Sequence, residues 1–300
     1  MHLADAAALI NALCWAATGV TAKTLSSAVR PYHLITVHTL VAASAFVLIA
    51  VASGSTSAIA ATPARALLLF AGAAVLNTFG SYIFFTAVAR GTVGGTYTTT
   101  TGLYVLLSLL AGAVFLDERI LPLAGVGAAG IVAGVYILNR PGKGRATEAR
   151  QQSLGMRGRL LTGMGLGAVT AVLWTCGLLV LKWGLDDSDP LTGAFMRNIV
   201  ASGIYVGVGF IIGRQKAIPR TRRRDWTVML MSAAFFTAST YTWNYALANS
   251  DAGRTAVLSS TAPVFALVLA VLFLKEKLSK VALVCAVCAI AGMLFVVIAN

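Results

Sequence analysis

The chain has 300 residues, of which 58% are hydrophobic and only 11% are charged, and its mean hydropathy is +0.83. This composition excludes an ordinary water-soluble surface and predicts an integral membrane protein. Because a crossing helix needs about 20 apolar residues, the length allows roughly ten crossings and leaves no room for a soluble catalytic domain. The net charge of +13 then belongs to loops beside lipid, so nucleic acid is not expected as a partner.

Apolar windows bounded by charged residues or by Gly, Pro and Ser predict an all-α membrane fold with ten transmembrane helices. In chain order the predicted spans are residues 3–25, 33–53, 66–89, 93–116, 122–139, 160–183, 191–213, 226–249, 255–274 and 281–299. A basic linker, residues 141–159, separates a first unit of residues 1–140 from a second unit of residues 160–300.

Lysine and arginine are distributed unevenly between the two sides of the predicted bundle. Four lie on the side of the termini, 18 lie on the opposite side, and Arg197 falls inside the seventh span. By the positive-inside rule this bias places both termini outside and the basic linker in the cytoplasm. We therefore expect a multi-pass protein of a bacterial or archaeal cytoplasmic (inner) membrane. The basic loops can also bind anionic membrane lipid, which requires the same orientation.

The two units match each other when the chain is shifted on itself by 159 residues. An odd number of five spans in each unit forces the second copy to enter the bilayer upside down relative to the first. The pattern thus predicts two inverted five-helix repeats around a central cavity, a plan typical of secondary transporters that work by alternating access. The matched residues include Trp15 and Trp174, Lys23 and Lys182, Pro31 and Pro190, and Tyr82 and Tyr241.

Short motifs recur in the same order in both units. They include Leu13-Cys14-Trp15 and Leu173-Trp174, Leu116-Asp117-Glu118-Arg119-Ile120, and Ala262-Pro263-Val264-Phe265 followed by Leu274-Lys275-Glu276-Lys277-Leu278. Together they resemble the ten-span members of the drug/metabolite transporter superfamily, which are built from two EamA-type repeats. The resemblance implies a carrier of small metabolites whose cavity is lined by the first, third and fourth spans of each repeat.

The chain departs from that family pattern in two ways. Many ten-span relatives keep their termini in the cytoplasm, whereas the charge distribution here predicts the reverse. Val105 stands where the second unit has Pro263, which suggests that the two units are not functionally equivalent.

Charged groups inside the predicted spans are few. All ten acidic residues fall at span ends or in loops, which argues against a proton-coupled exporter of cationic drugs. Arg197 is a candidate anchor for a carboxylate or phosphate, although its side chain could instead reach the outer lipid headgroups. Its counterpart in the first unit, His38, is a candidate proton-handling group or a hydrogen-bonded packing residue.

Hydroxyl, amide and aromatic side chains gather in the spans that the family resemblance points to. Such side chains can line a wet cavity, or they can bond helix carbonyls and pack between helices. The predicted substrate-binding residues are Trp15, His38, Asn77, Tyr82, Tyr97, Thr98, Thr101, Tyr104, Trp174, Arg197, Tyr241, Asn244, Tyr245, Ser259 and Ser260.

These features favour a secondary active transporter of a small polar metabolite, with an amino acid or related compound as first candidate and export as the direction that family habit suggests. No GxxxxGK[ST] motif, cofactor site or metal site is expected, and the protein is not expected to be an enzyme. Protons remain a candidate coupling ion, and the chain is expected to work as a monomer or homodimer. The alternatives are a sugar-phosphate or nucleotide-sugar exchanger, a cationic drug exporter, an intramembrane enzyme acting on lipid, or a non-transporting membrane subunit.

Overall fold

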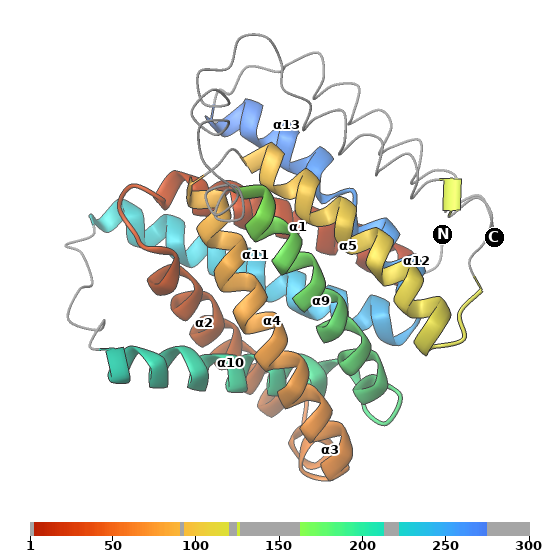
Figure 1. Ribbon diagram of the computed structural model, residues 1–300. Helices are drawn as coiled ribbons and strands as arrows, with labels where there is room; N and C mark the ends of the chain where they lie inside the picture. Colours follow the sequence, from red (N-terminus) through yellow and green to blue (C-terminus); the bar gives the residue numbers. More distant parts are fainter. Residues whose placement is uncertain (1–2, 91–92, 120–124, 127–162, 213–221, 275–300) are drawn as a thin grey trace.

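The computed structural model describes residues 3–90, 93–119, 125–126, 163–212 and 222–274 (Figure 1). These ranges are helical and contain no strand. The predicted spans 122–139 and 281–299 and the basic linker lie outside the described residues. The helices are α1 (Leu3–Leu25), α2 (Pro31–Ala52), α3 (Thr56–Ala60), α4 (Ala64–Arg90), α5 (Val93–Phe115), α9 (Gly163–Leu185), α10 (Pro190–Ile212), α11 (Arg223–Ala248), α12 (Ala252–Ser259) and α13 (Ala262–Leu274).

Six described segments are long and apolar enough to cross a membrane: Leu3–Leu25, Pro31–Ala52, Ala64–Ala89, Gly165–Leu185, Pro190–Ile211 and Ala252–Phe273. Helix α11 coincides with the predicted span 226–249 but is not among them, because polar residues lower its hydropathy. Several of these polar side chains bond their own helix; Thr237 and Thr240, for example, donate to the carbonyls of Ala233 and Phe236.

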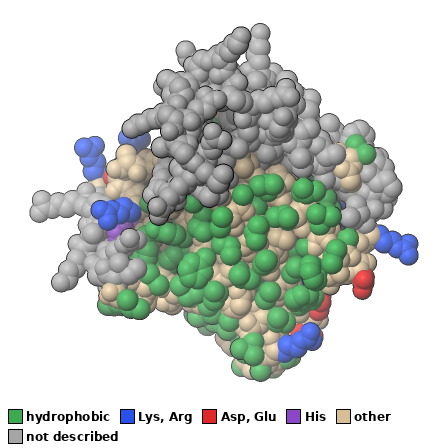
Figure 2. All heavy atoms as spheres, viewed as in Figure 1, with side chains coloured by type: hydrophobic (Ala, Val, Ile, Leu, Met, Phe, Trp, Pro, Cys, Tyr) green, Lys and Arg blue, Asp and Glu red, His purple; other side chains and the backbone are tan. Residues whose placement is uncertain are grey.

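The outer surface of the helices is hydrophobic. On the face shown in Figure 2, hydrophobic side chains cover the middle of the described part, and Lys, Arg, Asp and Glu side chains lie toward its margins. Large apolar side chains project outward, including Leu48 at 70% exposure and Ile211 at 85%. In water this surface would be strongly unfavourable, whereas lipid tails cover it without cost.

The predicted span 255–274 is not one helix, so this element of the prediction was wrong. The chain forms α12 and then α13, with a turn at Ser260 and Thr261 between them. Pro263 explains the break, since it has no N–H to continue the hydrogen-bond ladder from Ser259. Val105 occupies the corresponding place in α5, and α5 runs unbroken.

Contacts between helices recur in the two units. Helix α1 packs against α11 as α9 packs against α4, and α1 packs against α12 and α13 as α9 packs against α5. Lys23 Nζ donates to the carbonyl of Val88 at 3.4 Å, and Lys182 Nζ donates to the carbonyl of Leu247 at 2.8 Å. Both members of each pair are related by the shift of 159 residues, so the same lysine-to-helix-end contact occurs twice.

Glycines allow α4 and α9 to approach closely, as the adjacent ribbons in Figure 1 illustrate. A Cβ at Gly80 would lie 2.6 Å from Trp174 Cδ1, and a Cβ at Gly184 would lie 2.7 Å from Phe70 Cε1. Neither distance is possible without moving the aromatic ring, so these glycines fix the position of the rings between the two helices.

Candidate functional site

A cavity lies between the two units and is lined by residues of α1, α2, α4, α5, α9, α10, α11 and α12, together with Ala262 of α13. Its volume of about 150 Å³ gives room for about ten water molecules at ~15 Å³ each. The cavity is therefore large enough for a small metabolite and too small for a bulky one.

The lining of the cavity repeats with the sequence. Positions that differ by 159 residues face the cavity from equivalent helices of the two units. The pairs are Trp15 and Trp174, Thr39 and Asn198, Asn77 and Phe236, Ser81 and Thr240, and Thr101 and Ser260. Since both members of each pair contribute, the cavity belongs to both units.

Aromatic rings form part of the cavity wall. Trp15 and Trp174 meet edge to face, with ring centroids 5.5 Å apart and an interplanar angle of 75°. Tyr104 lies 6.2 Å from Trp174 and 6.3 Å from Trp243, measured between ring centroids. These rings offer an apolar surface whose faces can also attract a cation.

Arg197 reaches the cavity from α10. Its Nη1 donates to Oδ1 of Asn244 at 2.7 Å, and Nδ2 of Asn244 donates to the carbonyl of Pro190 at 3.3 Å. Asn244 is fully buried in α11, so it holds the guanidinium at a fixed place. Nε of Arg197 is buried and has no hydrogen-bond partner among the described residues. The side chain thus turns toward α11 and the cavity.

Not every predicted residue faces the cavity. His38 is fully buried beside it, with Nε2 3.0 Å from Ser232 Oγ and its ring stacked on Phe236 at 5.3 Å. Tyr82, Tyr241 and Tyr245 do not line the cavity, and Asn244 acts through Arg197. The side chains of Tyr97 and Thr98 lie outside the described part. The predicted residues that line the cavity are Trp15, Asn77, Thr101, Tyr104, Trp174, Arg197, Ser259 and Ser260.

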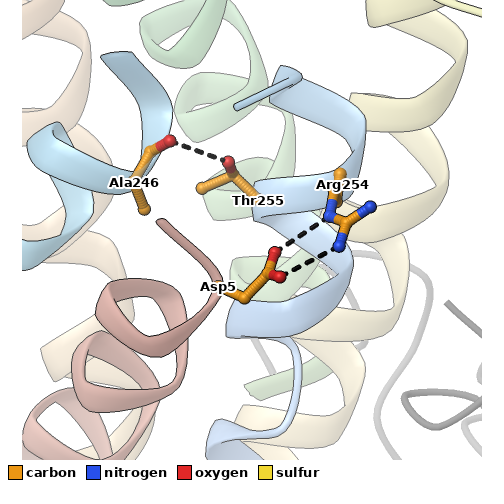
Figure 3. A network of polar contacts seen from close by, with 4 residues as sticks. All are labelled: Asp5, Ala246, Arg254 and Thr255. Atoms are coloured by element: carbon orange, nitrogen blue, oxygen red, sulfur yellow. Dashed lines mark hydrogen bonds and ion pairs between the residues drawn. The ribbon is translucent and has the colours of Figure 1, made fainter. Parts of the chain in front are cut away.

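Polar contacts tie α12 to the first unit near one end of the bundle. Arg254 Nε and Nη2 donate to the two oxygens of Asp5 at 2.9 and 3.0 Å, while Thr255 of the same helix donates to the carbonyl of Ala246 (Figure 3). Glu118 follows α5 and accepts hydrogen bonds from the backbone N–H groups of Ala252 and Gly253 at 2.6 and 2.8 Å. A carboxylate at this place satisfies the free N–H groups at the start of α12.

Comparison with known proteins agrees with this arrangement. The model of the EamA-like transporter family matches residues 2–140 and 161–298, which covers most of the chain in two segments. The chain belongs to this family. The predicted membership of the drug/metabolite transporter superfamily is thereby confirmed, and this EamA-like protein is a multi-pass membrane transporter, not an enzyme.

Individual relatives of this EamA-like transporter are distant. The "Uncharacterized transporter YoaV" of Bacillus subtilis (strain 168) is 26% identical over 135 residues, a match that spans 44% of each chain. A solved structure, described only as "Crystal structure of protein", covers 97% of this chain with 95% of its own at a TM-score of 0.74 and 18% identity. At that identity the likeness concerns the fold alone.

Sequence reasoning missed several residues that line the cavity of this EamA-like transporter. In α4 and α11 it selected Tyr82 and Tyr241, whereas the preceding residues, Ser81 and Thr240, face the cavity. One residue along a helix turns the side chain by about 100°, which separates the two choices. The repeat itself carried a usable signal, because small polar residues stand at both members of this pair. Other lining residues that were missed are Asn11, Ile35, Thr39, Thr78, Asn198, Tyr205, Phe236 and Ser239.

Proposed function

We propose that the protein is a secondary active transporter that carries a small polar metabolite through the central cavity by alternating access. An amino acid or a related compound is the first candidate, and export is the proposed direction. The observation that carries the proposal is the cavity lined by repeat-related pairs such as Trp15 and Trp174. A site shared by two equivalent units can open to either side by rocking one unit against the other.

The two units, residues 1–140 and 160–300, are proposed to be inverted repeats of five spans each. The recurring helix contacts and the paired lysine contacts of Lys23 and Lys182 support a duplicated unit. The charge distribution supports a cytoplasmic linker, residues 141–159, with both termini outside. The interruption between α12 and α13, beside Ser259 and Ser260, resembles the broken helices that transporters place at their substrate sites.

The chemistry of the cavity favours this proposal over other carriers. An exchanger of sugar phosphates or nucleotide sugars needs several cationic groups in its cavity, but Lys23 and Lys182 bond helix-end carbonyls and do not line it. Arg197 is therefore the one cation among the described lining residues. None of the described acidic residues lines the cavity either, which disfavours export of cationic drugs.

Transport is tested with the purified protein in proteoliposomes. The vesicles are challenged with labelled amino acids, sugar phosphates and cationic drugs, with and without a pH gradient. We expect saturable movement of an amino acid or a related compound. Movement of sugar phosphates or cationic drugs alone would contradict the proposed substrate class, and movement of none of them would contradict the proposed function.

A further inference from the structure

We propose that the cavity selects small organic monoanions by their carboxylate group, which Arg197 binds, and that an ammonium group on the ligand is not recognised. The inference rests on the proposed function, because it assigns the ligand of the same cavity. It predicts that a deaminated acid is bound at least as well as the amino acid of the same shape.

The guanidinium of Arg197 is presented in a state ready to bind an anion. Asn244 occupies Nη1 at 2.7 Å, and its own anchor on the carbonyl of Pro190 fixes the direction of the fork. The buried Nε keeps an N–H donor without an acceptor among the described residues. A buried donor without a partner is unfavourable, so an incoming carboxylate oxygen would supply what the protein leaves out.

Charge balance decides between an anion and a zwitterion. Arg197 has no ion pair among the described residues, and none of the acidic residues described lines the cavity. A monoanion brings the loaded cavity to neutrality, which is the favourable state inside a membrane. A zwitterion leaves one positive charge in excess, and a doubly charged phosphate leaves one negative charge in excess.

The two units are not equivalent at this position. His38 is the counterpart of Arg197, and Phe85 is the counterpart of Asn244 under the shift of 159 residues. In the first unit the pair is apolar, since the His38 and Phe85 rings meet edge to face at 5.8 Å and His38 is fully buried. The anion site therefore lies on the side of the second unit and binds one carboxylate.

The remainder of the cavity suits an apolar body. Trp15, Trp174, Tyr104 and Trp243 present aromatic surface, and the volume of about 150 Å³ limits the ligand to a small molecule. A ligand with a carboxylate at one end and a hydrophobic group at the other matches the cation and the rings together.

The test uses three compounds of one shape: 3-phenylpropionate, which has only the carboxylate; L-phenylalanine, which has both groups; and 2-phenylethylamine, which has only the ammonium. Binding to the purified full-length protein is measured by calorimetry and by quenching of tryptophan fluorescence, because three tryptophans line the cavity. We expect 3-phenylpropionate to bind at least as tightly as L-phenylalanine, and 2-phenylethylamine to bind much more weakly. Tighter binding of either amine-bearing compound would overturn the inference.

Variants assign the effect to one residue. In Arg197→Gln we expect the affinity for 3-phenylpropionate to fall roughly thirtyfold or more, and in Arg197→Lys we expect a smaller loss. Arg65→Gln is the matched control, because this arginine is 72% exposed and pairs with Asp187 at the surface, so no change is expected. Unchanged affinity in Arg197→Gln, with the protein folded by its thermal transition, would overturn the inference.

The inference and the proposed function fail differently. Carboxylate binding that depends on Arg197 without any movement across proteoliposomes would refute transport and leave the binding site in place. Transport of an amino acid that is unchanged in Arg197→Gln would refute the anion site and leave transport in place.

Discussion

Removing one partner of the Asp5–Arg254 ion pair should destabilise the protein strongly. The pair is bidentate, with distances of 2.9 and 3.0 Å, and the side chains of Arg254 and Asp5 are only 13% and 3% exposed. Breaking such a pair leaves a charge buried without its partner, which costs about 3–5 kcal/mol. We therefore expect Asp5→Leu to lower the free energy of unfolding by an amount of that order.

The structure offers a matched comparison for this prediction. Arg65 and Asp187 form an ion pair at 3.1 Å whose side chains are 72% and 34% exposed. Exposed pairs contribute about 0–1 kcal/mol, so Asp187→Leu should be nearly neutral. The double variant Asp5→Leu/Arg254→Leu should recover most of the loss, because apolar side chains replace a buried pair at little cost.

The assay is unfolding of the purified protein in mixed micelles of a mild detergent and SDS, followed by tryptophan fluorescence. A double-mutant cycle then separates the coupling between Asp5 and Arg254 from the effect of each substitution. Equal losses in Asp5→Leu and Asp187→Leu, or a double variant less stable than either single variant, would refute the reasoning.

Two further predictions concern packing near the cavity. Glu118→Gln should lower stability by about 0.5–2 kcal/mol in the same unfolding assay, because the cap on the N–H groups of α12 loses its charge; an unchanged protein would exclude a capping role. Gly80→Ala should displace Trp174, since the new Cβ would lie 2.6 Å from its ring, and should alter both tryptophan emission and ligand binding. Gly203→Ala is the control, because nothing lies within 4 Å of a Cβ there, and equal effects of the two alanines would contradict the packing.

Sequence patterns predicted the helices well because hydropathy reports directly on membrane burial. They predicted helix rotation poorly. In a soluble helix one face is polar and the rotation can be read from the pattern, but lipid makes the outer face apolar as well. This is why Tyr82 was chosen in place of Ser81, and why Arg197 could be placed in the cavity only from the structure.

The repeat compensated for part of this loss. Trp15 and Trp174 were selected because they match in register, and both line the cavity. The register also related His38 to Arg197, but it could not show that the two positions differ in environment. That difference depends on the residues opposite them, Phe85 and Asn244, and thus on packing between helices far apart in the sequence.

Access to the cavity from the two sides of the membrane tests the central claim most directly. Ser81→Cys and Thr240→Cys place one thiol in the cavity from each unit, in a protein whose four native cysteines are replaced. Each thiol is exposed to a membrane-impermeant reagent in right-side-out and in inverted vesicles, and Ser57→Cys in the exposed helix α3 serves as the one-sided control. Alternating access predicts that both cavity thiols react from both sides and are protected by substrate, with Ser57→Cys reacting from outside only. Cavity thiols that react from one side alone, or not at all, would contradict the account.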